Sequence, residues 1–212
     1  MDVSILEALF HDAQSIGLIG PAPVQTQISH SMRFCALVEE RLKLSHLASK
    51  ARLADLGSGA GIPGLVVAGM LPSLEVVLID SMEKRSKFQQ HAIQALGLDN
   101  CRSVNARAED VGRSREFRTS FDLVTSRSFG KPAIVVECAA PLLRIPGYLI
   151  VSEPPEERSS RWSDSVIRRL GLSSSITPNS SLSPRMNVFE KISDTPAEFP
   201  RKVGIPAKRP LF

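Results

Sequence analysis

Apolar residues in the N-terminal quarter of the chain recur every three or four positions, the spacing of a helix with one buried face. This spacing predicts a helix over residues 2–15 and a second one over residues 32–47. Residues 17–23 between them are rich in Gly and Pro and are expected to form a linker. We therefore expect residues 1–50 to form a helical extension that precedes the main domain.

From residue 51 onward, short continuous apolar runs alternate with amphipathic stretches. Continuous runs are typical of strands buried on both faces, so the alternation predicts a parallel sheet with helices on either side. The Ser-rich residues 171–184 are expected to form an exposed loop. The predicted strands span residues 52–56, 75–80, 101–105, 121–126, 147–153 and 185–192, and the predicted helices span 63–70, 83–96 and 132–143.

The 212 residues, of which 42% are hydrophobic, suffice for one globular domain with a sizeable core. No apolar run reaches the roughly 18 residues of a membrane-spanning helix, and the first residues lack the basic segment of a signal peptide. Cys35, Cys101 and Cys138 are isolated and match no zinc-binding spacing. We expect them to be reduced thiols, and we predict a cytoplasmic protein without a metal site.

Residues 55–64 connect the first predicted strand to the helix after it and contain four glycines. The next predicted strand ends in an acid, Asp80. A strand, a glycine turn, a helix and a second strand ending in an acid form the βαβ unit that binds nucleoside-containing cofactors. Glycine suits the turn because a Cβ atom would keep the backbone N–H groups away from the ligand.

Two cofactor classes fit this unit, dinucleotides and S-adenosylmethionine (SAM). Residues 59–64 match the dinucleotide pattern GxGxxG, and Asp80 lies roughly 20 residues further on, where a ribose-binding acid is expected. Asp55 favours SAM, because its charge at the end of a buried strand needs a cationic partner and the ammonium group of the methionine moiety would supply one. Pro63 also favours SAM, because it lacks an N–H group that a pyrophosphate would use. A nicotinamide oxidoreductase has no support beyond the shared βαβ pattern.

Basic residues are concentrated in the last twelve positions of the chain. Arg201, Lys202, Lys208 and Arg209 lie there without an acidic residue, and their four charges equal the net charge of the whole chain, +4. Such a patch suits the phosphate backbone of a nucleic acid.

Five segments of the chain resemble the bacterial small-subunit ribosomal RNA guanine-N7 methyltransferase family, once called glucose-inhibited division protein B. They are the cofactor motif at 55–64, an acid and Ser followed by Lys-Arg at 80–85, Arg-Ala-Glu at 107–109, Thr-Ser-Arg-Ser at 125–128 and the tail at 199–211. The tail reads Phe-Pro-Arg where the family usually has Tyr-Pro-Arg. The resemblance implies a Rossmann-like class I SAM-dependent methyltransferase domain over residues 51–212, an α/β fold with a mostly parallel seven-stranded sheet and helices on both faces.

The resemblance also implies the residues of the site. Asp55 would face the methionine end of SAM, and Asp80 would bind the ribose hydroxyls. The other expected cofactor contacts are Gly57, Gly59, Gly61, Ile62, Ala108, Glu109 and Arg127. The expected RNA contacts are Arg127, Arg201, Lys202, Lys208 and Arg209.

The implied reaction transfers a methyl group from SAM to N7 of a guanine in small-subunit ribosomal RNA or in a small-subunit particle. N7 carries a free lone pair, so no residue has to remove a proton, and catalysis rests on alignment of the reactants. We therefore expect no catalytic acid or base, and we expect a monomer. Removal of the residues after Pro200 is expected to weaken RNA binding and to leave SAM affinity largely intact.

Two departures from the family lie on the substrate side. The N-terminal segment has His30-Ser31 but lacks the family's Trp-Asn, Asn-Leu-Thr and Asp-Ser features. The fifth strand ends in Glu153 where the family has a Lys, so a negative group would replace a positive one that faces RNA. These departures leave two alternatives open, a SAM-dependent paralogue acting on another RNA or a small molecule, and a non-catalytic RNA- or ribosome-binding protein.

Overall fold

The computed structural model describes residues 1–44, 51–154, 161–173 and 184–212. These residues form a six-stranded sheet in the order β3-β2-β1-β4-β5-β6, in which β6 alone runs antiparallel to its neighbour. The strands are β1 (Arg52–Leu56), β2 (Glu75–Asp80), β3 (Cys101–Asn105), β4 (Phe121–Ser126), β5 (Leu143–Ser152) and β6 (Met186–Lys191).

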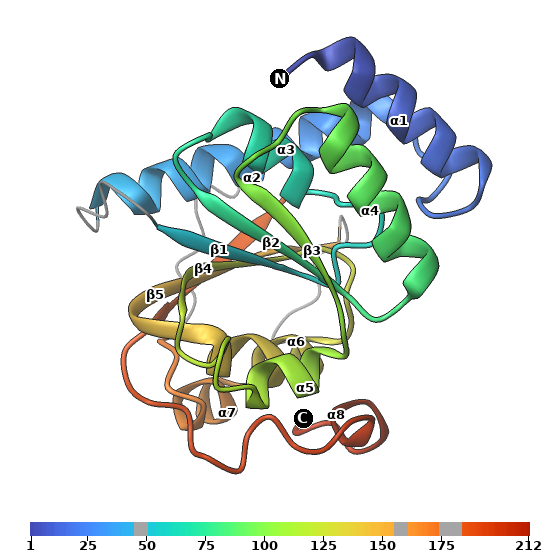
Figure 1. The fold of residues 1–212 in the computed structure, drawn as a ribbon. Coiled ribbons are helices and arrows are strands. Elements are labelled where there is room, and N and C mark those ends of the chain that lie inside the picture. The colour runs from blue at the N-terminus through green and yellow to red at the C-terminus, as the bar shows by residue number, and fades with distance from the viewer. Residues whose placement is uncertain (45–50, 155–160, 174–183) are drawn as a thin grey trace.

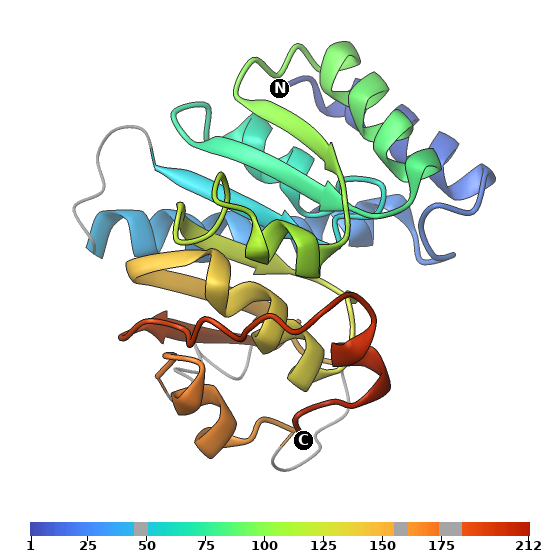
Figure 2. The same ribbon diagram turned by 60° about the horizontal axis from the view of Figure 1, so that its bottom comes forward.

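Helices cover both faces of the sheet (Figure 1). Seen from below, the red C-terminal segment runs past α6 to α8 (Figure 2). One layer contains α1 (Val3–Ser15), α2 (Val24–Leu44), α3 (Gly64–Met70) and α4 (Glu83–Ala95). The other contains α5 (Ala108–Arg113), α6 (Pro132–Ala139), α7 (Asp164–Arg169) and α8 (Ile205–Lys208), with a 3-10 turn at Ala140–Leu142.

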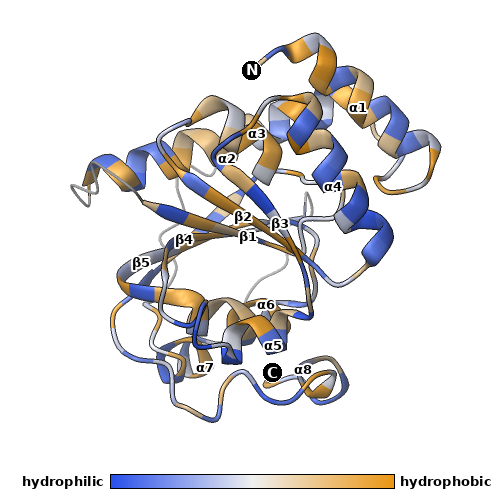
Figure 3. Ribbon diagram, in the orientation of Figure 1, coloured by the Kyte–Doolittle hydropathy of each residue, from blue (hydrophilic) through white to orange (hydrophobic). Residues whose placement is uncertain are grey.

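Successive side chains of each strand enter two different apolar cores, because strand residues alternate between the faces of a sheet. Leu53 and Leu78 belong to the core beneath α1 to α4, whereas Ala54 and Val77 belong to the core beneath α5 to α7. Hydrophobic colour is prominent in β2 and α3, whereas much of α4 is hydrophilic (Figure 3). Side chains of α1 and α2 enter the first core, so the N-terminal extension packs directly on the sheet.

The second helix begins at Val24, well before its predicted start at residue 32. Its first turns bury the polar residues Gln27 and Ser31, so no apolar period marks them in the sequence. The end of this predicted helix and most of the loop predicted at 171–184 lie outside the described residues. The strands predicted at 52–56, 75–80, 101–105 and 121–126 are confirmed with the same bounds.

The described part of the chain contains six strands, whereas the resemblance implied seven. Beyond β6, Leu172 forms an isolated antiparallel bridge with Lys191. The described sheet therefore ends at β6 and this bridge, and residues 174–183 that follow Ser173 are not described.

The register of the parallel strands brings the carboxyl ends of β1, β2 and β4 together. Leu56, at the end of β1, pairs with Ile79 of β2 and with Ser126 of β4. Asp80 and Asn105 pair at the ends of β2 and β3. Ligands of open parallel sheets bind outside these ends, so this edge is where a cofactor site is expected.

None of the helices in the described ranges is long and apolar enough to span a membrane. The same ranges contain no group of three His, Cys, Asp or Glu side chains placed to hold a metal ion.

Cys35, Cys101 and Cys138 are buried free thiols. Burial raises the pKa of Cys35 and of Cys101 to about 12, so both remain protonated at neutral pH.

Candidate cofactor site

The glycine-rich turn between β1 and α3 is tied to the end of β2. The N–H groups of Gly57 and Ser58 donate to the carbonyl oxygen of Ile79, at 2.9 and 3.1 Å. Gly57 has a φ of 70°, and a Cβ atom there would lie 2.3 Å from Cδ2 of Phe129. Gly57 is therefore required both for its left-handed conformation and for the space that it leaves. Gly59 and Gly61 also have positive φ angles.

Asp80 is buried at the end of β2 with its carboxylate fixed in place. Its Oδ2 accepts a hydrogen bond from the N–H of Gly59 at 2.9 Å, and its Oδ1 accepts one from the N–H of Met82 at 2.9 Å. Arg85 adds an ion pair to Oδ2 at 3.4 Å. Asp80 thus connects the glycine turn to the start of α4, at the position where the sequence predicts a ribose-binding acid.

Gln89 of α4, which is not among the predicted site residues, supports the glycine turn through its side chain. Its Nε2 donates to Oγ of Ser58 at 2.9 Å and to the carbonyl oxygen of Gly59 at 2.7 Å. Its Oε1 accepts a hydrogen bond from Oγ of Ser103 at 2.6 Å. Gln89 is fully buried. A polar residue on the inner face of an amphipathic helix is the signal that could have revealed it.

Asp55 requires a correction, because its side chain does not reach the cofactor cavities. It is fully buried, and its oxygens accept hydrogen bonds from the N–H of Gly64 at 3.0 Å and from Oγ1 of Thr125 at 2.8 Å. Burial raises the pKa of Asp55 to about 7, although these two hydrogen bonds favour the charged form. Asp55 therefore joins the start of α3 to β4, and its partners are these protein groups.

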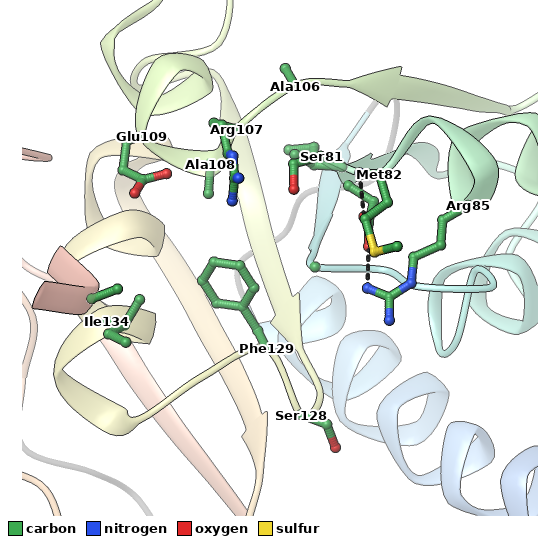
Figure 4. Close-up of a pocket in the computed structure, with 14 residues that line it drawn as sticks. Ser81, Met82, Arg85, Ala106, Arg107, Ala108, Glu109, Ser128, Phe129 and Ile134 are labelled. Carbon is green, nitrogen blue, oxygen red and sulfur yellow. Dashed lines mark hydrogen bonds and ion pairs between the residues drawn. The ribbon is translucent and has the colours of Figure 1, made fainter. Parts of the chain in front are cut away.

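Two adjoining cavities open at the carboxyl ends of the strands. The larger one has a volume of about 460 Å³, and the smaller one about 330 Å³. Gly57, Arg85 and Ser128 line both, so the glycine turn lies at their junction. In Figure 4, the ring of Phe129 points into the larger cavity from the loop after β4. The remaining lining of the larger cavity is Ile79, Asp80, Ser81, Met82, Ala106, Arg107, Ala108, Glu109, Ile134 and Ala207.

The smaller cavity is lined on one side by residues of the N-terminal extension. Gln27 of α2 accepts a hydrogen bond from the guanidinium group of Arg127, and both side chains line the cavity. His30 lies nearby on α2, and burial together with the charge of Arg127 lowers its pKa to about 4. Ile62 of the glycine turn lines the same cavity, as do Leu18, Ile19 and Gly20 of the linker.

Glu109 lines the larger cavity and is hydrogen-bonded to the C-terminal tail. Its Oε1 accepts a hydrogen bond from the N–H of Gly204 at 2.9 Å. Ala207, three residues further on, lines the same cavity. The tail therefore contributes to the wall of the cavity next to Ala108, in contrast to the expectation that SAM affinity is largely independent of the residues after Pro200.

Arg201 requires a second correction, because its guanidinium group is paired inside the protein. Nε and Nη2 donate to the two oxygens of Glu137 at 2.8 and 2.6 Å, and the Arg201 N–H donates to Oε1 at 2.9 Å. Glu137 is fully buried on α6. Arg201 thus holds the tail to α6, whereas Lys202, Lys208 and Arg209 are exposed.

Glu153, which follows β5, also differs from its expected role as a free negative group. It forms an ion pair with Arg161 and accepts hydrogen bonds from Nε1 of Trp162 and, at 2.6 Å, from Nδ2 of Asn187. The ring of Trp162 packs on Phe189 with centroids 4.9 Å apart. The carboxylate of Glu153 is therefore neutralised within the structure.

The strand order, the glycine turn, Asp80 and the paired cavities together define a Rossmann-like α/β protein with a site for a nucleoside-containing cofactor. The solved structure of a SAM-dependent methyltransferase from Aquifex aeolicus has the same fold, with a TM-score of 0.52 at 15% identity. That match covers 71% of this chain and 87% of the other.

Sequence comparison identifies the family within this class. A family model for rRNA small subunit methyltransferase G matches residues 4–157. A Ribosomal RNA small subunit methyltransferase G from Syntrophomonas wolfei is 42% identical over 76% of this chain and 77% of its own length. The protein of the same name from Desulfitobacterium hafniense is 36% identical over 81% of this chain and 74% of its own length. The chain therefore belongs to the rRNA small subunit methyltransferase G family, and its cofactor is SAM.

Proposed function

We propose that this protein transfers the methyl group of SAM to N7 of a guanine in small-subunit ribosomal RNA. The observation that carries the proposal is the pair of joined cavities at the glycine turn, with the fixed carboxylate of Asp80 on one wall. When bound, SAM supplies an electrophilic methyl group on its sulfonium sulfur. The family membership of the chain supports ribosomal RNA as the acceptor.

The larger cavity fits the adenosine end of SAM. Its volume of about 460 Å³ lies within the range of small-molecule sites. Oδ2 of Asp80 accepts from Gly59 and from Arg85, whereas Oδ1 accepts from Met82 alone and keeps a further lone pair, so the carboxylate is able to accept a ribose hydroxyl through Oδ1. Met82, Ala108 and Ile134 supply apolar surface for the adenine ring.

The smaller cavity fits the methionine end. Arg127 is the cation placed to pair with the ligand carboxylate, and Gln27 fixes its direction. Gly59 and Ile62 supply the wall of the turn. The cofactor contacts that we propose are Gly57, Gly59, Ile62, Asp80, Ala108, Glu109 and Arg127, with Asp55 and Gly61 maintaining the turn.

The residues of this site act by positioning and not by proton transfer. Guanine N7 attacks through its own lone pair, so no side chain has to remove a proton before the methyl group moves. The turn and Asp80 fix the cofactor so that the nucleophile, the methyl carbon and the leaving sulfur lie in line. This alignment lowers the activation barrier, because the bound reactants are already oriented for the transfer.

RNA recognition is assigned to the basic groups beside the cavities. Lys202, Lys208 and Arg209 are exposed and suited to phosphate contacts, and Arg127 lines the smaller cavity, where we propose that it also contacts the RNA. We propose that the protein acts as a monomer in the cytoplasm, on the RNA alone or on a small-subunit particle. The replacement of a Lys by Glu153 favours a different acceptor, but the pairing of Glu153 with Arg161 neutralises the negative charge that the replacement introduces.

A methyl-transfer assay tests the proposal. Small-subunit ribosomal RNA transcribed in vitro, and small subunits lacking their own methylation, are incubated with the protein and with SAM labelled in its methyl group. We expect label in one of the two substrates, recovered as 7-methylguanosine after nuclease digestion. Label on another base, or on no RNA while SAM still binds, would contradict the proposal.

A further inference from the structure

The C-terminal segment 199–208, here called the strap, is fastened to the helices that form one wall of the larger cavity. Arg113 of α5 donates to the carbonyl oxygen of Pro200 at 2.7 Å. Arg118 donates through Nη1 to the carbonyl oxygen of Phe199 at 2.7 Å. Gly112 of α5 lets the strap approach, since a Cβ atom there would lie 2.8 Å from Cγ of Pro200.

The middle of the strap is fastened in the same way. The ion pair between Arg201 and the fully buried Glu137 holds it to α6. The hydrogen bond from Gly204 to Glu109 then holds it at the start of α5, and Ala207 completes the cavity wall. The inner face of the strap is thus part of the cofactor site.

The outer face of the strap carries exposed positive charge. Lys202 and Lys208 are exposed, as is Arg209 directly after the strap. Arg107, which lines the larger cavity, is a further exposed cation near the strap. Exposed Lys and Arg side chains suit phosphate groups of a nucleic acid.

We propose that the strap couples RNA binding to cofactor binding, so that each ligand raises the affinity for the other. Phosphates bound to Lys208 and Arg209 would hold the strap in the position in which the Gly204 N–H donates a hydrogen bond to Glu109 and Ala207 lines the cavity. A cofactor in the cavity would favour the same position. The same segment then carries the phosphate-binding cations and one wall of the cofactor cavity, so each ligand favours the strap position to which the other binds, which is the origin of positive cooperativity. This inference rests on the proposed RNA substrate.

The coupling is measured by titrating the full-length protein with S-adenosylhomocysteine, which has no methyl group to transfer. The titration is done with and without saturating small-subunit ribosomal RNA transcribed in vitro. We expect RNA to lower the Kd of S-adenosylhomocysteine by at least about fivefold, and the ligand to lower the Kd of RNA by the same factor, as linkage requires.

Two variants test whether the strap is the connection. Glu109→Met removes the acceptor for the Gly204 N–H and should reduce the coupling factor towards one. Lys208→Gln combined with Arg209→Gln should also reduce it. The matched control is Lys43→Gln combined with Lys87→Gln, which removes two exposed charges from α2 and α4 and should leave the factor unchanged.

The outcomes separate this inference from the proposed function. If both ligands bind and neither changes the Kd of the other, the coupling is overturned and the proposed function stands. If Glu109→Met keeps the full coupling factor, the strap is not the connection and the proposal is overturned. If the RNA neither binds nor accepts a methyl group, the proposed function and the coupling fail together.

Discussion

Oε1 of Glu109 accepts a hydrogen bond from the backbone N–H of Gly204 at 2.9 Å, across 95 positions of the chain. The contact brings the C-terminal strap to the start of α5, where Ala108 and Glu109 line the larger cavity. It connects a segment that resembles an RNA-binding tail to the cofactor site. We therefore expect the tail to contribute to cofactor binding, which its charge alone does not reveal.

A chain that ends at Pro200 should lose cofactor affinity, in contrast to the expectation from the sequence. Removal of Gly204 and Ala207 opens one wall of the cavity and leaves Glu109 without its partner. We expect the Kd of SAM to rise by at least about tenfold, the equivalent of one charged hydrogen bond. Calorimetric titration measures it, with a chain ending at Arg209 as the control. Equal affinities for the two truncated chains would show that the strap does not support the site.

Gly57→Val should abolish SAM binding, because the new Cβ atom would lie 2.3 Å from Phe129 and the φ of 70° does not suit a branched residue. Gly97→Val is the matched control. Gly97 also has a positive φ of 61°, but no atom lies within 4 Å of its Cβ position. Titration with SAM should give no binding to the first variant and ordinary binding to the second. SAM binding by a folded Gly57→Val variant would contradict the assignment of the turn.

Asp80→Ala should likewise abolish measurable SAM binding, because it removes the carboxylate that we assign to the ribose hydroxyls and releases the N–H groups of Gly59 and Met82. The control is Glu75→Ala, at the exposed opposite end of the same strand. Thermal unfolding verifies that both variants fold. An unchanged Kd for Asp80→Ala would remove Asp80 from the cofactor site.

Asp55 predicts a specific pH dependence of stability. Burial raises its pKa from the ordinary 3.8 to about 7 in the folded protein, so the folded state binds the extra proton between these values. The contribution of Asp55 to the free energy of unfolding should therefore decrease as the pH rises from about 4 to 7. Urea unfolding of the wild type and of Asp55→Asn at several pH values measures it, and the stability difference between them should change across this window. Parallel curves would rule out the raised pKa.

Arg201→Met tests whether Arg201 anchors the tail. It leaves the buried carboxylate of Glu137 without its cation, which should lower the free energy of unfolding by about 3 kcal/mol. Lys202→Met, an exposed neighbour, should change it by less than about 0.5 kcal/mol. Urea unfolding compares the two. Equal free energies of unfolding for the two variants would show that Arg201 does not anchor the tail.

The sequence predicts a strand most directly where a continuous apolar run lies between polar turns, as in 75–80, whereas β5 begins at Leu143, before its predicted start at residue 147. It also predicts the location of Asp80, because a βαβ unit fixes where its second strand ends. Short helices such as α5 and α8 are missed, since four to six residues cannot display a helical period. The partners of Asp55, Glu109 and Arg201 are missed for another reason: they lie far away in the sequence, and only the folded chain brings them together.

The most direct test of the central claim is calorimetric titration of the full-length protein with SAM, with NAD as the control ligand. The glycine turn, Asp80 and the two joined cavities predict saturable binding of one SAM per chain and no binding of NAD. The Asp80→Ala variant should bind neither. Folded wild-type protein that binds NAD, or that fails to bind SAM, would contradict the assignment of this site to a methyltransferase.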